Sequence, residues 1–235
     1  MMRNALLVIP LLTLLTTAAP SAEKRPVQVF LLAGQSNMEG QGVVDLDHPQ
    51  HYNGGKGILE RVMQDPRKAK QFAHVKDDQG NWVVRDDVWV RFQTRHSLKK
   101  GPLSIGYAGY PGKHHIGPEF QFGHVVGARL EEQVLLIKTA WGGKSLYKDF
   151  RPPSSDGETG PYYTKMLQET RAALENLPQD FPDYDGRGWE LAGFVWFQGW
   201  NDMFDAKARA EYEENLVNLI KDVRKDLGGA RSCRS

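Results

Sequence analysis

The sequence predicts an α/β protein of three layers, in which helices cover both faces of a parallel sheet. Several short runs have the apolar, β-branched and aromatic content of buried strands; they span residues 27–33, 88–92, 133–138 and 191–197. Between the later runs, apolar residues recur at the spacing of an amphipathic helix. Strands that alternate with helices in this way are typical of a parallel sheet.

Composition limits the class of protein. The chain has 235 residues, 40% of them hydrophobic, which is enough for one globular domain with a sizeable core. A formal net charge of +1 gives no reason to expect nucleic acid or an anionic membrane as a partner. Cys233 is the single cysteine, so the sequence excludes an intramolecular disulfide and a Cys/His zinc site.

Residues 1–22 are predicted to form a secretory signal peptide, leaving residues 23–235 as the domain. Arg3 precedes an apolar core, and small residues follow it as a cleavage region. The apolar core is too short for stable membrane insertion. An uncleaved N-terminal anchor is the alternative, and in either case we expect a secreted or periplasmic domain.

The first half of the domain begins with the strand at residues 27–33, which ends at Gly34 and leads into a polar turn that contains Ser36. Residues 41–87 are predicted to be an elaborated loop that carries no chemistry. The strand at residues 88–92 is followed by a glycine-rich loop over residues 93–116. Pro118, with Glu119 beside it, then marks the start of a helix.

The second half repeats the strand–turn–helix order. The strand at residues 133–138 leads to the paired glycines Gly142 and Gly143, and Pro161 opens the next helix. The strand at residues 191–197 ends at Gln198, and the last helix is predicted over residues 206–227. Right-handed crossovers place the loops that follow parallel strands at one edge of the sheet. We therefore expect the sequence's most polar turns to gather there, where ligands bind in open α/β sheets; they are the turns at Ser36, His114-His115, Gly142-Gly143 and Gln198.

Three segments resemble the conserved blocks of the SGNH hydrolases, in the same order along the chain. The first is Gly34-Gln35-Ser36-Asn37-Met38, the second is Gly143 with Lys144 and Ser145, and the third is Trp196-Phe197-Gln198-Gly199. Because its third block has glutamine, the chain most resembles the branch that contains sialate O-acetylesterases and acetylxylan-esterase-like carbohydrate esterases. The resemblance implies a flavodoxin-like α/β/α fold.

The resemblance also implies roles for single residues. Ser36 would be the nucleophile, while Gly143 and Gln198 would stabilise the oxyanion that forms on the ester carbonyl. No metal and no organic cofactor are implied. The predicted substrate contacts are Gln35, Asn37, Trp141, His115 and Trp200.

Each of these residues also has a purely structural interpretation. Ser36 could cap the helix after the strand, and Gly142-Gly143 could form a simple tight turn. Trp141 and Trp200 could pack at the sheet edge, and His114 and His115 could be exposed loop residues. A phosphate loop of the Walker type does not fit the second block, because position 138 is lysine where that motif needs glycine.

One block of the resemblance is absent. SGNH hydrolases carry Asp-x-x-His near the C-terminus, where the histidine acts as general base, but here no histidine follows His124. We interpret the sequence as lacking the C-terminal end of the domain through a truncated or frameshifted reading frame. The alternative is a true variant whose base comes from elsewhere or is absent. Loss of a terminal strand and helix would leave apolar faces uncovered.

The leading functional hypothesis is an exported serine carbohydrate esterase that removes O-acetyl groups from sugars, so the expected partner is an acetylated carbohydrate. A catalytically inactive glycan-binding remnant is the first alternative, because the predicted base is missing. A flavodoxin-like module that binds a phosphorylated ligand through the Gly34 and Gly142 turns is the second. The sequence gives no indication of the oligomeric state.

Overall fold

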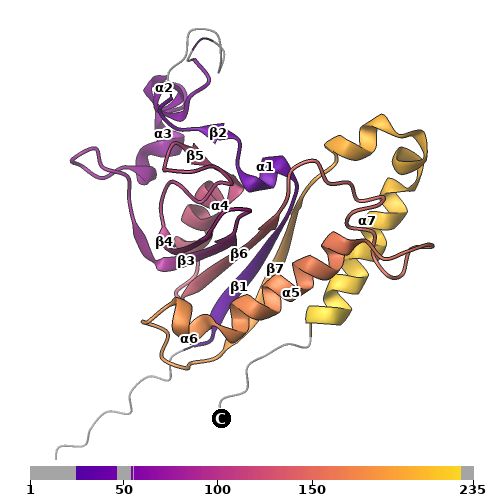
Figure 1. Cartoon of the computed structure of the whole chain (residues 1–235). Helices are drawn as coiled ribbons and strands as arrows, with labels where there is room; N and C mark the ends of the chain where they lie inside the picture. Colours follow the sequence, from indigo (N-terminus) through magenta and orange to yellow (C-terminus); the bar gives the residue numbers. More distant parts are fainter. Residues whose placement is uncertain (1–24, 47–53, 55, 229–235) are drawn as a thin grey trace, which may run out of the picture.

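A five-stranded sheet forms the middle layer of the computed structural model, which describes residues 25–46, 54 and 56–228. The strand order is β4-β3-β6-β1-β7, and all neighbours are parallel except β4, which runs antiparallel to β3. Helices lie against both faces of the sheet (Figure 1). The predicted three-layer α/β architecture is confirmed.

The strands of the large sheet are β1 Val27–Gly34, β3 Arg85–Gln93, β4 Leu98–Leu103, β6 Val134–Ala140 and β7 Trp189–Phe197. A two-stranded antiparallel ribbon pairs β2 (Gly42–Val43) with β5 (His115–Ile116). The helices are α1 Ser36–Glu39, α2 Leu59–Gln64, α3 Ala69–Phe72, α4 Pro118–Gly127, α5 Pro161–Glu175, α6 Leu177–Asp180 and α7 Ala206–Leu227, with 3-10 turns η1 Ala73–Val75 and η2 Trp200–Phe204. Each of the described helices is too short or too polar to cross a membrane.

Alternation along β1 divides the core between the two faces of the sheet. Val29 and Leu31 belong to the apolar cluster that includes buried residues of α5 and α7, whereas Leu32 belongs to the cluster that includes Met38 of α1. Side chains of a strand point alternately to opposite faces, so an unbroken apolar run such as β1 fits a strand covered on both sides.

The helix starts follow the signals in the sequence. Pro118 and Pro161 each occupy the first turn of a helix, as predicted, where the missing N–H of proline has no intrahelical partner to lose. The long helix α7 is capped by Asp205, whose carboxylate accepts hydrogen bonds from the backbone N–H groups of Lys207 and Ala208. These starts direct α4, α5 and α7 back along the sheet.

The region between β3 and α4 differs from the prediction of a single glycine-rich loop. Residues Leu98–Leu103 form β4, which pairs with β3 at the edge of the sheet. The sequence pattern did not indicate this strand, because it contains Lys99, Lys100, Gly101 and Pro102. These residues are uncommon in central strands but are tolerated at an edge.

A fully buried ion pair lies between β6 and α4. Lys138 of β6 and Glu119 of α4 have completely buried side chains, and Lys138 Nζ lies 2.6 Å from Glu119 Oε2. The same ammonium donates to the backbone oxygens of Glu39 (3.1 Å) and Tyr107 (2.6 Å). The pair therefore joins β6 and α4 to the end of α1 and to the loop after β4.

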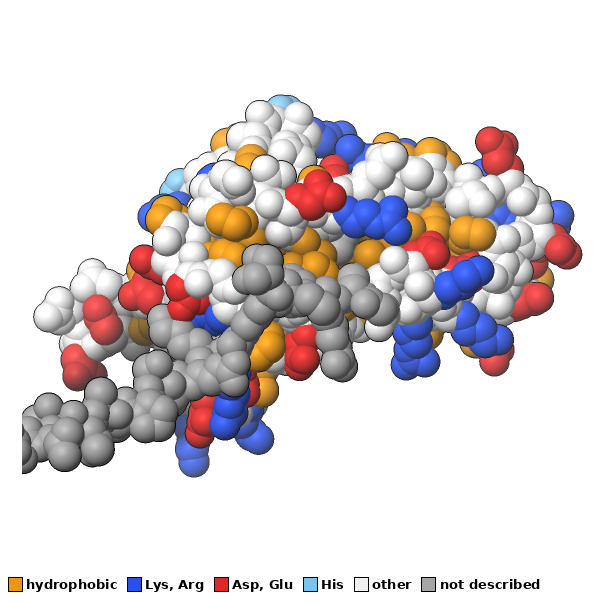
Figure 2. All heavy atoms as spheres, turned by 90° about the horizontal axis from the view of Figure 1, so that it is seen from below, with side chains coloured by type: hydrophobic (Ala, Val, Ile, Leu, Met, Phe, Trp, Pro, Cys, Tyr) orange, Lys and Arg blue, Asp and Glu red, His pale blue; other side chains and the backbone are white. Residues whose placement is uncertain are grey.

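The other edge of the sheet is formed by β7, which pairs only with β1 among the described strands. No residue of β7 is fully buried. An apolar groove of about 510 Å³ runs beside it, lined by Leu191, Phe194 and Trp196 of β7 and by Leu216, Ile220 and Val223 of α7. Figure 2, the view from below, shows hydrophobic side chains gathered near the centre of the visible surface.

Candidate active site

Three neighbouring parallel strands end side by side and bring three predicted turns together. Gly34, the last residue of β1, pairs in register with Ala140 of β6 and with Phe197 of β7. The turns that follow contain Ser36, Gly143 and Gln198. The structure therefore gathers these three sequence-predicted residues at the carboxyl edge of the sheet.

Ser36 follows a turn that begins at Gly34, a position where only glycine fits. A Cβ on Gly34 would lie 2.2 Å from the Phe197 carbonyl oxygen, so a side chain at this position would force β1 and β7 apart. Ser36 is half-buried and is the first residue of α1, while Asn37 beside it is exposed. The serine thus lies at the surface of the edge, on a backbone fixed by the sheet.

Backbone donors converge near Ser36. Within the described part of the chain, the N–H groups of Ser36 and Gly143 have no hydrogen-bond acceptor. Gly143 has a φ of +73°, which favours glycine, and its carbonyl accepts from Asn201 Nδ2 at 2.7 Å. Unpaired N–H groups at adjacent turns are the kind of donors that stabilise a developing oxyanion.

Gln198 is held differently from the prediction of a free amide donor. Its Nε2 donates to Lys144 O at 2.9 Å and to Asp202 Oδ2 at 2.5 Å, and its Oε1 accepts from the Tyr212 hydroxyl at 3.1 Å. Both N–H groups of the amide therefore have protein acceptors. Donation from Gln198 to an oxyanion would require one of these hydrogen bonds to be exchanged.

Gln35 is not placed as the predicted substrate contact. Its side chain is 1% exposed, and the amide orientation that satisfies its neighbours donates to Lys144 O and to Asn201 Oδ1, both at 3.0 Å. In that orientation its oxygen accepts from the Trp200 backbone N–H at 3.3 Å. Gln35 therefore ties the Ser36 turn to the other two turns, and burial removes it from the ligand-facing surface.

Asp202 is a buried anchor that sequence reasoning did not identify. Its carboxylate is 2% exposed and accepts hydrogen bonds from the backbone N–H groups of Leu146 (2.9 Å) and Tyr147 (2.8 Å), besides the Gln198 amide. The turn after β7 is thereby clamped to the loop after β6. An acidic residue four positions after Gln198 was visible in the sequence, but its partners 55 and 56 residues away were not.

Glu39 is a second acidic residue that sequence reasoning missed. Partial burial raises the pKa of the Glu39 carboxyl above its ordinary value, against the lowering effects of Arg95 and of a hydrogen bond from the Gly142 backbone. A Cβ on Gly142 would lie 2.9 Å from Glu39 Oε2 and 3.7 Å from Ser36 Cβ, so this glycine lies close to both residues. A cavity of about 230 Å³ opens beside this carboxyl, lined by Glu39, Arg95, His96, Gly109, Tyr110 and Pro111.

The two predicted aromatic contacts lie in opposite environments. Trp141 is 6% exposed and packs in the core against Phe150 and Tyr162, so its burial argues against the predicted contact with substrate. Trp200 is 62% exposed and stays a candidate contact. The sequence placed both tryptophans at strand-to-helix turns and could not distinguish them.

His114 and His115 lie on the ribbon of β2 and β5. His114 Nδ1 is 2.7 Å from Asp45 Oδ1, and the His115 ring stacks on Tyr110 with ring centroids 4.4 Å apart. Burial, followed by the charges of His114 and Lys99, lowers the pKa of His115. No contact of the described residues joins either histidine to Ser36, so His115 as a substrate contact stays a prediction.

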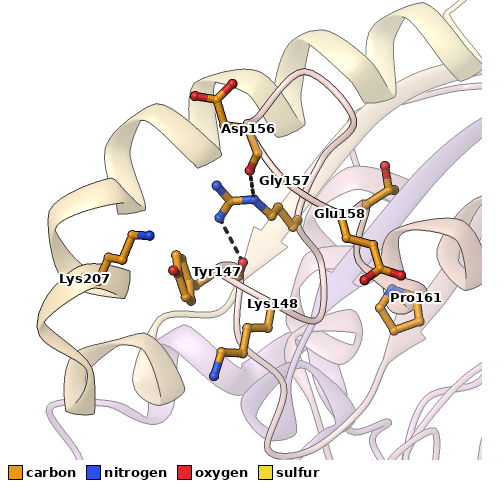
Figure 3. A pocket seen from close by; sticks show the side chains of 9 residues that line it. Tyr147, Lys148, Asp156, Gly157, Glu158, Pro161 and Lys207 are labelled. Carbon is orange, nitrogen blue, oxygen red and sulfur yellow. Dashed lines mark hydrogen bonds between the residues drawn. The ribbon is translucent and has the colours of Figure 1, made fainter.

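A larger cavity of about 530 Å³ lies between the loop after β6 and the start of α7 (Figure 3). Most of its cationic groups have internal partners. Arg151 donates to the backbone oxygens of Tyr147 and Asp156 and to the Glu211 carboxylate, and Lys207 lies 3.7 Å from Glu211. Through Glu211, these ion pairs connect the loop after β6 to α7. In the described ranges, no group of three His, Cys, Asp or Glu side chains is arranged to hold a metal ion.

Comparison with known proteins decides the family. The family described as "Carbohydrate esterase, sialic acid-specific acetylesterase" matches residues 26–231. The chain belongs to this family. The resemblance found in the sequence, to SGNH carbohydrate esterases of the sialate O-acetylesterase branch, is confirmed.

Among curated proteins, the chain is similar to a probable carbohydrate esterase of Arabidopsis thaliana, with 26% identity over 206 residues. The match covers 86% of this chain but 65% of the plant protein, so the chain spans less than two thirds of the length of this curated relative.

Among solved structures, the crystal structure of an Arabidopsis thaliana protein aligns with a TM-score of 0.51 and 22% identity, over 86% of this chain and 70% of the other. The structure of NanS aligns with a TM-score of 0.50 and 15% identity, over 89% and 64%. At these identities the two structures support the fold, not the chemistry.

Proposed function

We propose that the chain is an exported serine carbohydrate esterase that hydrolyses O-acetyl esters on sugars. The observation that carries this proposal is the placement of Ser36 beside two backbone N–H groups without acceptors, those of Ser36 and Gly143, at the ends of adjacent strands. Membership of a carbohydrate esterase family supports the same chemistry.

In the proposed reaction, Ser36 Oγ forms a bond to the acetyl carbonyl carbon while its proton passes to a base. The negative charge that develops on the carbonyl oxygen is stabilised by the Ser36 and Gly143 N–H groups, with Gln198 as a third donor after exchange of one of its hydrogen bonds. The sugar hydroxyl leaves with a proton, and water then releases acetate from the acyl-serine.

Sugar recognition is proposed to use Asn37 and Trp200, both exposed beside the Ser36 turn. An aromatic side chain can cover the apolar face of a sugar ring while neighbouring amides bind its hydroxyls. Acetylated carbohydrate is accordingly the proposed partner. Export rests on the apolar segment within residues 1–22, which lies outside the described residues.

The first test replaces the nucleophile. Ser36→Ala is expected to lower acetate release from 4-nitrophenyl acetate and from an acetylated glycan by at least about 10³-fold, because no acyl-serine can form. Ser97→Ala, at the exposed turn between β3 and β4, is the matched control and should keep wild-type activity. Equal rates for Ser36→Ala and the wild type would disprove the mechanism.

A glycan-binding protein without esterase activity is the second candidate function. It is favoured by one observation: among the described residues, no histidine makes a hydrogen bond with Ser36. This candidate predicts saturable binding of an acetylated glycan by the wild-type chain with no release of acetate.

A further inference from the structure

Exposed hydrophobic side chains are concentrated just after β7. Of the large hydrophobic residues that are at least about one third exposed, four lie in the short segment from 197 to 204: Phe197, Trp200, Met203 and Phe204. Single exposed apolar residues are ordinary on a protein surface, whereas a cluster marks an interaction site. We define the η2 platform as Trp200, Met203 and Phe204, with exposed fractions of 62%, 47% and 70%.

The η2 platform has a fixed shape. The rings of Trp200 and Phe204 meet at 71° with centroids 5.5 Å apart, so they form an angled surface, not one plane. Asp202, between them in the chain, is buried and hydrogen-bonded to the loop after β6. Arg209, in the first turns of α7, donates a hydrogen bond of 2.6 Å to the Met203 carbonyl. The exposed rings thus stand on a rigid support.

The platform is continuous with the candidate active site. The Trp200 backbone N–H donates to Gln35, the neighbour of Ser36, and Asn201 Nδ2 donates to Gly143 O. Trp200 begins η2 beside the neighbour of Ser36, and Phe204 ends it, so along the chain Trp200 is the platform residue nearest to the candidate active site. Rigid aromatic faces bordered by amides suit sugar rings, which have apolar faces and hydroxyl edges.

We infer that the η2 platform binds a second sugar ring, next to the one that carries the acetyl group, so that the chain recognises acetylated oligosaccharides in preference to acetylated monosaccharides. This inference rests on the proposed function for the location of the acetylated ring. It adds Met203 and Phe204 as residues that determine specificity through binding.

The test compares binding within two matched pairs of probes, using the whole chain. One pair is O-acetylated N-acetylneuraminic acid and the same sugar at the end of sialyllactose; the other is acetylated xylose and acetylated xylotetraose. In at least one pair the wild type should bind the longer probe about tenfold more tightly, measured by calorimetry. Phe204→Ala should remove most of this difference and leave the affinity for the monosaccharide unchanged.

Two further variants guard against a folding artefact. Phe204 is so exposed that its truncation should leave the melting temperature within about 2 °C of wild type. Phe204→Tyr keeps an aromatic face and should restore the preference for the longer probe. Val125→Ala removes an exposed apolar side chain from α4, outside the platform, and should change neither affinity.

The outcomes separate this inference from the proposed function. Binding of the longer probe that depends on Phe204, without acetate release, would retain the platform and disprove the esterase. Three results would overturn the inference. They are equal affinities within both pairs, absence of binding to all four probes, and a preference that Phe204→Ala leaves intact. A concentration-dependent dimer abolished by Phe204→Ala would assign the platform to a second copy of the chain and would overturn it as well.

Discussion

Strands β6 and β7 are both apolar parallel neighbours of β1, yet their surroundings differ. Every residue of β6 is buried, because β1 and β3 flank it and helices cover both faces. No residue of β7 is buried, because β1 is its single neighbour among the described strands. The comparison teaches that an apolar run predicts a strand but does not predict how completely the strand is enclosed.

The largest effect expected on the β6 side comes from its buried ion pair. Lys138→Met leaves the Glu119 carboxylate buried without its partner and should lower the free energy of unfolding by about 3 to 5 kcal/mol. Urea unfolding followed by circular dichroism measures this loss. Lys207→Met removes an exposed lysine from a long ion pair with Glu211, which keeps Arg151 as its partner, and is the control, with little expected loss of stability. A similarly small loss for Lys138→Met would mean that the buried ion pair does not contribute to the stability of the fold.

A pair of leucine truncations sharpens the comparison between the strands. Leu136→Ala in β6 creates a cavity in a closed core and should cost about 2 to 5 kcal/mol. Leu191→Ala in β7 removes a side chain that is already partly exposed and should cost about 1 kcal/mol. The same urea series measures both. Equal costs would show that β7 is enclosed in solution.

His124 gives the smallest of the three effects and depends on pH. It is buried in α4, and burial, with the charges of His74 and Arg85, lowers the pKa of His124 to about 4. The folded chain therefore binds fewer protons than the unfolded chain between pH 6.5 and pH 4, so stability falls as pH falls through this window, by about 2 to 3 kcal/mol. Melting temperatures measured across the window test this.

His124→Phe removes the titrating group while keeping a ring against Phe120, so its stability should depend less on pH over the same window. His96→Gln replaces an exposed histidine and should keep the wild-type dependence. If His124→Phe loses stability in acid as steeply as the wild type, another group is responsible.

Local patterns predicted much of the fold and of the site's framework. Prolines at helix starts, apolar runs and the turn at Ser36 depend on residues close in sequence, and the structure has each of them. The edge strand β4 was not predicted, because edge positions tolerate the lysines, glycine and proline that argue against a strand.

The features that sequence reasoning missed depend on residues far apart in the chain. Asp202 and Glu39 acquire their environments from loops that only the fold brings near. Trp141 and Trp200 occupy similar positions after their strands, and only packing decides that one is enclosed and the other exposed. The hydrogen bonds that engage the Gln198 amide could not be found from the sequence, because its partners Lys144 and Tyr212 belong to other elements.

The carboxylate of Asp202 has a consequence for motion. Since it holds Leu146, Tyr147 and Gln198 at once, we expect the turns after β6 and β7 to open together. The amide protons of Leu146 and Tyr147 should then exchange with solvent at similar rates, through one common opening. A ligand that displaces either turn would be felt at both, which makes the edge respond as a unit.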